Sequence, residues 1–400
     1  MMKKELAEYT LGEKFLFFLA FSCGFSLAGV HIAIGLSIAF LLYFFATNYR
    51  DLKPSSSILK WYLILLLCWL FYVVTAQEIK HSFRIFSYFA LSLMPIFFAY
   101  FFVNAEKTLQ KLLLVASFSC TINAFIIIYE VLFAGAHRSG GNMDILNYGI
   151  LAGLVVTSLT ILLFRNFHKY SIKLRCLIFF ILAVNILGII CNSTRAIMLG
   201  LLVSFVISLI AFLRVLSKKH LVIFTFILFI VGAIFINTSS RIFFTIERTR
   251  SNYSIASRII WWEYAIDTFK KHPIFGVGTA NFPVPDIDRK TFEVISRPAE
   301  TKRVYSQTVH SSYLQILATM GIFGFLSYFS FWFNATIRPM CKAIVKNKTW
   351  GYVMLANFIF FFSCAFTDFI LLKYNMYMFT FFVGISLKGI ILSSGKENKW

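Results

Sequence analysis

Three basic residues stand beside apolar stretches, where a polar group must meet either lipid or a polar ligand. Arg195 ends the run Asn192-Ser193-Thr194-Arg195, Arg258 follows Ser257, and His310 precedes the apolar stretch at 313–335. A guanidinium group presents a bidentate fork that suits phosphate oxygens. These residue types at these positions indicate a site for an anionic ligand near the ends of the apolar stretches.

Arg195 lies at the start of an apolar stretch that we expect to be helical. Ser193 or Thr194 can cap this helix, whose N-terminal amides and dipole favour an anion. The alternative is that Arg195 only extends to lipid headgroups. We favour the anion site, because the charge pattern described below places this short connection on the outer side of a membrane, where Arg is less favoured.

Arg258 begins a stretch in which Ile259, Trp262, Ala265, Ile266 and Phe269 share one side of a predicted amphipathic helix over 258–271. A cation at a helix start is repelled by the positive end of the helix dipole, so another favourable interaction must offset this repulsion. Contact with lipid headgroups, an ion pair with Glu263 or Glu247, or a bound anion would each supply such an interaction. The helix should end at His272-Pro273, because the residue before a proline usually leaves the helix.

His310 is followed by two glycines at helical spacing, Gly321 and Gly324. At about 100° per residue, His310 and Gly321 lie roughly 20° apart around a continuous helix, and Gly324 lies about 40° to the other side. Small residues allow a neighbouring helix to pack closely and fix the backbone that bears the imidazole. The pattern predicts a helix-packing motif below either a catalytic His or a simple polar anchor.

Other polar residues give weaker indications. Arg138, in a short connection, could add to an anion site or meet headgroups, and Asp368 ends an apolar stretch, where an acid is costly unless paired or hydrated. Asp286 and Asp288 have the spacing of the metal-binding acid pairs found in nucleotide-sugar transferases. Nucleotide sugars are cytoplasmic, however, and this segment is expected to face outward. We predict no metal site and no cofactor.

The composition indicates that lipid is the main solvent of the chain. Of the 400 residues, 59% are hydrophobic and 14% are charged, against roughly 25% charged in soluble domains. The net charge of +21 could suggest nucleic acid, but basic residues in a membrane protein first report its topology. We expect no nucleic-acid partner, because no compact basic domain could hold a duplex.

Apolar stretches long enough to cross a bilayer predict an all-α polytopic membrane protein with about 12 transmembrane helices. The expected spans are 14–29, 31–47, 61–76, 84–103, 112–133, 146–164, 176–191, 196–213, 220–237, 313–335, 350–368 and 374–393. The short first pair could instead form a re-entrant hairpin.

Basic residues orient the predicted bundle. Short connections rich in Lys and Arg, around 50–60, 165–175, 214–219 and 338–348, fall on one side, which is cytoplasmic by the positive-inside rule. The chain then divides into nine helices over 1–237, one large outward loop with short helices at 238–312, and three helices with a cytoplasmic tail over 313–400. The stretch 275–282 within this loop is turn-rich, and it lacks the third glycine of a dinucleotide fingerprint.

These motifs together resemble the O-antigen ligase family, within a wider superfamily of O-antigen ligases and polymerases. The family carries a His, a polar residue, nine residues and then Gly-x-x-Gly, which matches His310-Ser311 and Gly321-Ile322-Phe323-Gly324 here. Ser193-Thr194-Arg195 and Ser257-Arg258 resemble the two Arg positions of the family. The Gly-x-Gly with Asn-Phe at 276–282 also fits the superfamily.

The resemblance implies a function. Family members transfer a glycan from undecaprenyl diphosphate to an acceptor, which for ligases is a lipid A-core sugar at the periplasmic face of the bacterial inner membrane. It implies that Arg195 and Arg258 hold the diphosphate and that His310 lies at the reacting centre, either as a base or as a group that orients the diphosphate. Arg138 and Asp368 resemble secondary positions for substrate contact or structure. A metal-independent inverting glycosyltransferase is therefore expected, with the lipid-linked O-antigen, the lipid A-core oligosaccharide and membrane lipids as its partners.

Two alternatives remain open from the sequence. A Wzy-type O-antigen polymerase shares the topology and the Arg-rich outer loops, but it extends a second lipid-linked repeat. A transporter of the same lipid would need paired broken helices and polar groups near the membrane midplane. The sequence favours the ligase over the transporter, because its cations gather near one surface.

Overall fold

The computed structural model describes residues 10–47, 57–75, 79–136, 138–212, 251–279, 309–367 and 374–394, and every regular element in these ranges is a helix. A three-residue 3-10 turn, Phe167–Lys169, follows α8, and a π-helical turn, Phe333–Ile337, joins α14 to α15. The helices are α2 (Leu11–Phe25), α3 (Leu27–Thr47), α4 (Ser57–Val74), α5 (Ile79–Ser92), α6 (Met94–Phe102), α7 (Glu106–Leu132), α8 (Ile145–Asn166), α9 (Ile172–Asn192), α10 (Arg195–Phe212), α12 (Ser251–Lys271), α14 (Ser312–Trp332), α15 (Arg338–Val345), α16 (Thr349–Thr367) and α17 (Tyr374–Leu392).

The prediction of a polytopic α-helical membrane protein is confirmed. Within the described ranges, seven helices are long and apolar enough to cross a membrane, and three shorter apolar helices accompany them at Leu27–Tyr43, Ile58–Val74 and Arg195–Leu209. The figure of 12 spans stays a prediction, since the expected span at 220–237 lies outside the described residues. The seven longer runs are Ile79–Phe102, Glu106–Leu132, Ile145–Lys169, Ile172–Asn192, Ser312–Val345, Thr349–Phe366 and Tyr374–Leu392.

Helices α8 and α17 form the centre of the bundle, and each is buried on nearly all sides. Both are mostly apolar, as a helix enclosed by other helices is expected to be, and their buried polar side chains include Thr157, Ser158 and Lys388. Polar contacts join the central helices where small side chains let them approach. Asn357 of α16 accepts a hydrogen bond from Thr157 (2.7 Å) and donates one to Ser158 (2.9 Å), both on α8.

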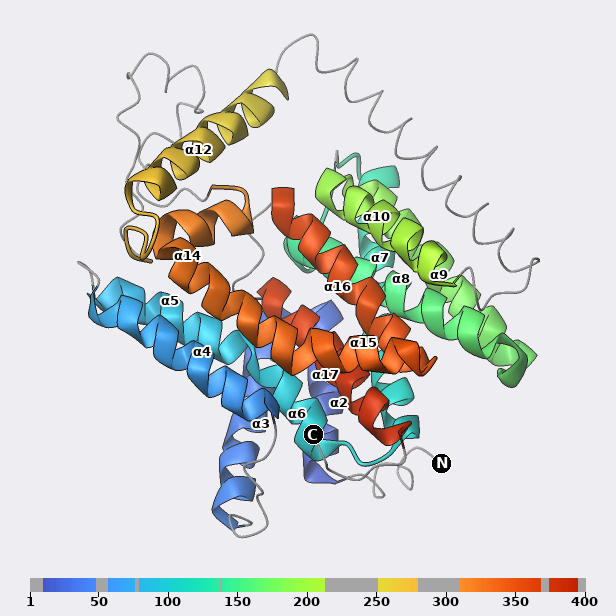
Figure 1. The fold of residues 1–400 in the computed structure, drawn as a ribbon. Helices are drawn as coiled ribbons and strands as arrows, with labels where there is room; N and C mark the ends of the chain where they lie inside the picture. Colours follow the sequence, from blue (N-terminus) through green and yellow to red (C-terminus); the bar gives the residue numbers. More distant parts are fainter. Residues whose placement is uncertain are drawn as a thin grey trace.

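The α5–α6 span is interrupted at Leu93, one residue before α6. Pro95 lies in the first turn of α6, and its missing amide removes one helical hydrogen bond. Figure 1 shows α4 and α5 side by side, with α6 continuing from α5 at an angle. The predicted continuous span at 84–103 is therefore a kinked pair of helices.

Helix α14 is interrupted at Gly321, which has φ 62° and ψ −165°. Glycine alone adopts this backbone conformation readily. The predicted continuous stripe of His310, Gly321 and Gly324 is therefore wrong: His310 precedes the helix, which starts at Ser312, and the helical rotation is lost at Gly321. Gly321 also packs against the backbone of a turn and not against another helix.

The backbone that approaches Gly321 is the segment Pro273–Gly278, here named the clamp segment. A Cβ atom added at Gly321 would lie 2.4 Å from the Ile274 carbonyl oxygen and 2.7 Å from the Gly276 nitrogen. The peptide groups released by the break in α14 bond to this segment. These bonds run from the amides of Val277, Gly278, Ile322 and Phe323 to the carbonyls of Ala318 (3.1 Å), Thr319 (2.7 Å), Pro273 (2.8 Å) and Ile274 (3.1 Å), respectively.

Two residues of other helices complete this junction. The Tyr72 hydroxyl of α4 donates to the Met320 carbonyl at 2.5 Å, and the Ser82 hydroxyl of α5 bonds to that of Thr279. A buried peptide group without a partner costs about 1–3 kcal/mol, so these bonds allow the span to break. The clamp segment thus ties the end of α12 to the transmembrane bundle.

Helix α12 lies over the first part of α14 (Figure 1). It begins at Ser251, seven residues before the expected start at Arg258, and ends at Lys271, just before His272-Pro273 as predicted. Ala265 and Trp262 of α12 form a small apolar cluster with Val309, Leu314 and Ala318. This cluster is separate from the main core, so α12 and the start of α14 form an outer layer.

Candidate functional site

The starts of α10 and α14, the end of α16 and the connection between α7 and α8 lie together at one end of the bundle, here named the His310 end. Arg138, Arg195 and His310 lie in these segments, and Arg258 lies on the neighbouring helix α12. Because the ends of helices far apart in sequence must be brought together, the hydrogen bonds between them define the site.

Asn192 joins the connection that carries Arg138 to the turn that carries Arg195. Its buried side-chain amide donates to the carbonyls of Ser139 (2.8 Å) and Ile145 (2.9 Å), and its oxygen accepts from the Thr194 hydroxyl. Asn192 therefore satisfies one carbonyl of the connection and one at the start of α8, and it fixes the residue before Arg195.

The turn before Arg195 differs from the expected cap. Ser193 ends α9 in the left-handed conformation, with φ 56°, and its hydroxyl donates to the Ile190 carbonyl at 3.0 Å. The Thr194 hydroxyl bonds to Asn192, so the described contacts of both hydroxyls are with the end of α9. Arg195 follows as the first residue of α10 with an exposed side chain.

The connection that carries Arg138 is also held from α7. Asn123 donates to the Gly140 carbonyl at 2.9 Å and accepts from the Asn142 amide at 2.8 Å. Gly141 has φ 61°, and an added Cβ would lie 2.5 Å from the Asn123 side-chain oxygen. The connection is thus pinned on both sides of its glycines, while the Arg138 side chain is exposed.

Helix α16 lies between the Arg195 turn and the start of α14. Its Cys364 thiol donates to the Ala196 carbonyl at 3.4 Å, and its Phe362 carbonyl accepts from the Tyr313 hydroxyl at 2.8 Å. Gly200 lets α10 approach closely, because an added Cβ would lie 2.6 Å from the Cys364 sulfur. Ala196, which follows Arg195, and Tyr313, three residues after His310, therefore contact positions two residues apart on α16.

The backbone at His310 adopts a left-handed conformation with φ 53°. Such a conformation is uncommon outside glycine, and it turns the chain sharply into α14. The preceding residue, Val309, is fully buried, and its amide donates to the Gln315 side chain at 3.0 Å. The His310 side chain itself is half-buried. The chain around His310 is therefore held from both sides.

Arg258 lies on the side of α12 that faces this turn. It is four residues before Trp262 and seven before Ala265, so all three share one face of the helix. Trp262 and Ala265 pack against Val309, the neighbour of His310. Arg258 is half-buried, and it forms no ion pair with Glu263 or any other described residue, while Glu247 lies outside the described ranges.

Within the described residues, Arg138, Arg195 and Arg258 all lack a carboxylate partner, since the ion pair present there joins Lys271 to Asp267. Glu130, beside the Arg138 connection, accepts a hydrogen bond from Ser139. The His310 end therefore presents cationic groups whose positive charge is available to an anionic ligand. Asp368, one residue past the end of α16, lies outside the described residues, as do Asp286 and Asp288.

The described part of the chain contains no group of three His, Cys, Asp or Glu side chains that could hold a metal ion. All seven cysteines are free. The absence of a metal and of a cofactor stays a prediction, because residues 280–308 and 368–373 lie outside the described ranges.

Sequence reasoning missed the clamp segment and the two asparagines. The glycines at 276 and 321 were visible as motifs, but their pairing requires knowledge of which segments meet. Asn123 and Asn192 stand in apolar stretches, where a buried amide needs partners. That placement was the signal that could have identified them as residues that fix the loops.

The fold and these side chains define a multi-pass α-helical membrane protein that gathers Arg and His residues at one end of its bundle. A family model described as O-antigen ligase matches residues 177–329, from α9 into α14. Residues 177–329 therefore match the O-antigen ligase family, as the motifs indicated, and that family consists of glycosyltransferase-like enzymes. The match includes Arg195, Arg258 and His310, whereas Arg138 and Asp368 lie outside it. No curated protein matches the chain.

Proposed function

We propose that this protein is an O-antigen ligase, which transfers polysaccharide from undecaprenyl diphosphate to a lipid A-core sugar. The observation that carries the proposal is that α10 and α14, both in the matched range of the family, each contact α16 at the His310 end, while α12 packs on α14. The enzyme would be an inner-membrane protein whose His310 end faces the periplasm. No ATP is available there, so cleavage of the sugar–diphosphate bond drives transfer.

Arg195 and Arg258 would bind the diphosphate of the donor. Arg195 adds its guanidinium to the amides of the first turn of α10, and the positive end of that helix dipole favours an anion. Arg258 approaches from α12, across the Trp262–Val309 contact. Negative charge grows on the diphosphate oxygens as the glycosidic bond breaks, and fixed cations stabilise that charge in the transition state.

His310 would act where the acceptor hydroxyl meets the sugar. The hydroxyl oxygen attacks the anomeric carbon on the face opposite to the diphosphate, so the configuration inverts. The hydroxyl proton leaves in the same step, and His310 would accept it. The alternative role, in which His310 orients the diphosphate, predicts a different pH profile, as described below. Arg138 and Asp368 would contact the substrates or support the neighbouring loops.

The proposal places positive charge where a metal ion assists other glycosyl transfers, so we expect a metal-independent reaction. The connections at the opposite end support the proposed orientation. Arg165 donates to the Asn347 carbonyl at 2.7 Å, which joins two basic connections that the sequence assigns to the cytoplasmic side.

The test is glycan transfer by the full chain in a reconstituted membrane with lipid-linked donor and core acceptor. His310→Ala should lower the rate by about 10²–10⁴ if the imidazole is a general base, and Arg195→Ala by about 10²–10³ through lost charge stabilisation. A base role also predicts that the His310→Ala variant loses the rise of rate with pH on the acidic side. An orienting role leaves that rise in place and raises the donor KM.

Matched controls come from the start of α5, which reaches the same end of the bundle near Thr279. Lys80 and His81 are exposed there, and Lys270 is exposed on α12. Alanine at each of these positions should leave the rate within about twofold, since each side chain is exposed and makes no described contact. Full activity in the His310 and Arg195 variants, or equal losses in the controls, would overturn the site assignment.

A Wzy-type polymerase remains the alternative within the same superfamily, and deletion of the gene distinguishes the two. Loss of a ligase leaves long polymer on its lipid carrier, whereas loss of a polymerase leaves single repeats attached to the core. A transporter is disfavoured, although the breaks at Leu93 and Gly321 resemble the broken helices that it would need. Movement of labelled lipid without a new glycosidic bond would support that function instead.

A further inference from the structure

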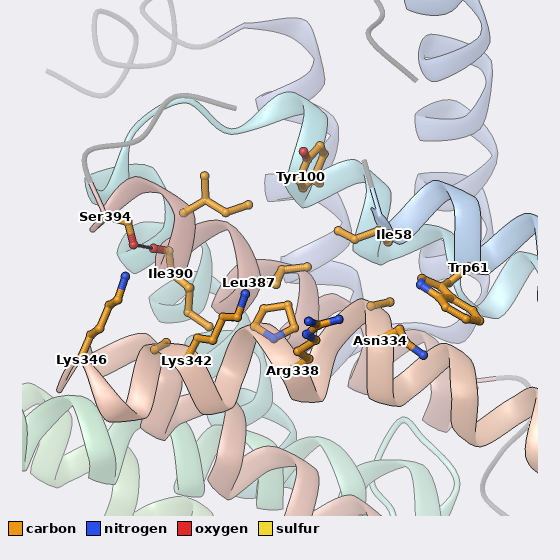
Figure 2. Close-up of a pocket in the computed structure, with 14 residues that line it drawn as sticks. Ile58, Trp61, Tyr100, Asn334, Arg338, Lys342, Lys346, Leu387, Ile390 and Ser394 are labelled. Atoms are coloured by element: carbon orange, nitrogen blue, oxygen red, sulfur yellow. Dashed lines mark hydrogen bonds between the residues drawn. The ribbon is translucent and has the colours of Figure 1, made fainter. Parts of the chain in front are cut away.

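A second region with ligand-binding features lies at the opposite end of the bundle, where α14 continues into α15. A cavity with a volume of about 240 Å³ opens there between α4, α6, α15 and α17. Its position is independent of the His310 end and of the proposed glycan transfer. Figure 2 shows the cavity with the side chains that line it.

Three cations line one side of this cavity. Arg338, Lys342 and Lys346 are spaced by four residues, so they follow one face of α15 and the turn after it. All three are exposed, and Figure 2 shows their side chains extending along the cavity. None of the 14 lining residues is acidic. The cavity therefore presents a row of positive charge.

The facing walls are mainly apolar. Helix α4 contributes Ile58 and Trp61, and α17 contributes Leu387, Ile390 and Ile391. Aliphatic side chains of this kind bind hydrocarbon through contact area and the hydrophobic effect. The cavity thus joins a cationic edge to an apolar wall within one space.

Two neighbouring lysines have structural partners and do not line the cavity. The Lys388 ammonium donates to the Tyr100 carbonyl at 2.9 Å, and the Lys348 ammonium donates to the Ser393 carbonyl. These bonds join α17 to α6 and to the connection after α15. They help to hold the walls in place around the cationic edge.

The backbone at this edge is irregular. The π-helical turn Phe333–Ile337 places Asn334 and Ala335 against the cavity, and Pro339 follows at the start of α15. Because Pro339 has no amide hydrogen, it cannot donate to the carbonyl of Ala335, four residues earlier. Such π turns inside helices are frequent at functional sites. Here the turn changes the helical register that sets which face of α15 borders the cavity.

Membrane topology alone explains part of this pattern. Basic residues gather on the cytoplasmic side, and cations near a helix C-terminus stabilise its dipole. Neither effect requires a cavity, nor the alignment of three cations above an aliphatic wall. A ligand with a negative head and a hydrocarbon chain matches both parts of the cavity.

We propose that this cavity binds an anionic phospholipid of the surrounding membrane. The phosphodiester lies against Arg338, Lys342 and Lys346, and one acyl chain follows Ile58 and Leu387. Arg338 can hold two phosphate oxygens at once, while the two lysines add point charges. Basic pockets between transmembrane helices on the cytoplasmic side bind lipid headgroups in this way.

The test is native mass spectrometry of the full chain in detergent, titrated with phosphatidylglycerol or with phosphatidylethanolamine. The triple variant Arg338→Gln, Lys342→Gln and Lys346→Gln should lose roughly tenfold or more in apparent affinity for phosphatidylglycerol, because each cation near an anionic surface strengthens binding. Phosphatidylethanolamine should bind weakly to both forms. A second variant, Ile390→Trp, fills the apolar wall without a change of charge and should weaken binding in the same direction.

The matched control replaces three exposed lysines near the starts of α7 and α9 at the same end, Lys107, Lys169 and Lys173, with the same change in net charge. Its affinity should stay within about twofold of the original protein, since these residues do not line the cavity. An equal loss in both triple variants would assign binding to general surface charge and overturn the proposal. So would displacement of the lipid by millimolar inorganic phosphate, which would mean that the acyl chain adds nothing. Elution of each variant as a single size-exclusion peak verifies that it is folded.

Discussion

Replacement of Gly321 by alanine tests whether the clamp segment holds the His310 end together. Gly321 has φ 62° and ψ −165°, and the backbone of Ile274 and Gly276 lies directly against its α-carbon. An added Cβ would approach the Ile274 carbonyl oxygen to 2.4 Å and the Gly276 nitrogen to 2.7 Å. Both neighbours are main-chain atoms, so no flexible side chain can move aside.

The expected cost has two parts. An L-residue held in this backbone region costs on the order of 1–3 kcal/mol. Relief of the steric overlap costs about 1–3 kcal/mol more, as in other overpacked sites. The sum, roughly 2–6 kcal/mol, is comparable with the net contribution of the four hydrogen bonds between the clamp segment and α14, about 1 kcal/mol each. We therefore expect Gly321→Ala to separate the clamp segment from α14 before it unfolds the bundle.

Hydrogen exchange measures this separation directly. The amides of Val277 and Gly278, which donate to Ala318 and Thr319, should exchange at least tenfold faster in the variant, and the melting temperature in detergent should fall by several degrees. Glycan transfer should fall as well, because the clamp segment leads out of α12, which carries Arg258. Exchange in the central helix α8 should stay unchanged.

Gly35→Ala is the matched control. Gly35 lies within α3, and nothing lies within 4 Å of a Cβ added there. Alanine is favoured over glycine inside a helix by about 1 kcal/mol, so this variant should be as stable as the original protein or slightly more stable. If Gly321→Ala melted and exchanged like Gly35→Ala, the account of the clamp segment would be wrong.

Three further substitutions test the contacts around the site. Asn192→Ala removes the amide that joins two connections and should lower the unfolding free energy by roughly 1–3 kcal/mol, as measured by thermal unfolding. Tyr72→Phe removes the hydroxyl that donates to the Met320 carbonyl and should cost about 1–2 kcal/mol, with faster exchange at the clamp segment. Trp262→Ala should cost about 1–3 kcal/mol, less than a fully buried Trp because the ring is half-exposed, and should raise the donor KM by loosening Arg258.

Each of these substitutions has a control and a contrary outcome. Asn142→Ala, at an exposed position in the same connection, should leave stability unchanged, and equal effects at 142 and 192 would refute the bridging role. Tyr43→Phe removes the hydroxyl of an exposed tyrosine on α3 and should leave stability unchanged, so it is the control for Tyr72→Phe. If Trp262→Ala changed kcat alone, with an unchanged donor KM, Arg258 would not depend on the packing of α12.

The helices were predictable because their signal is local. Apolar runs and basic connections place α8, α9, α16 and α17 within a few residues of the expected spans, whereas α7 begins six residues before the expected start at 112. The end of α12 at Lys271 followed from Pro273 for a similarly local reason. Its start at Ser251 was missed, because 251–257 lacks the apolar periodicity that marks the later turns.

The break at Gly321 was not predictable from periodicity. Helical rotation can be extrapolated from His310 to Gly321 only if every intervening residue is helical, and neither end of that interval is. A glycine in an apolar run fits either close helix packing or a close approach by non-helical backbone. Only the position of the clamp segment, about 45 residues earlier in the chain, decides between them.

The predicted cations show the same difference between local signals, which the sequence reveals, and long-range contacts, which it does not. Their residue types identified the chemistry, and the family match contains three of them. Their positions relative to one another depend on contacts between segments far apart in the sequence, which are made by Asn192, by α16 and by the cluster around Trp262. Sequence patterns identify residues suited to a diphosphate, whereas tertiary contacts determine which of them can meet the same one.

The broken span also bears on how the protein is made. Helix α14 alone would enter the membrane with the peptide groups around Gly321 unpaired, which lipid cannot satisfy. The clamp segment precedes α14 in the chain and is synthesised first. It can therefore reach the membrane face at the His310 end before α14 inserts. Insertion of this span and closure of the site would then be one event. A chain that lacks 273–278 should insert its earlier helices normally and fail at α14, and normal insertion of α14 in that chain would refute this order of assembly.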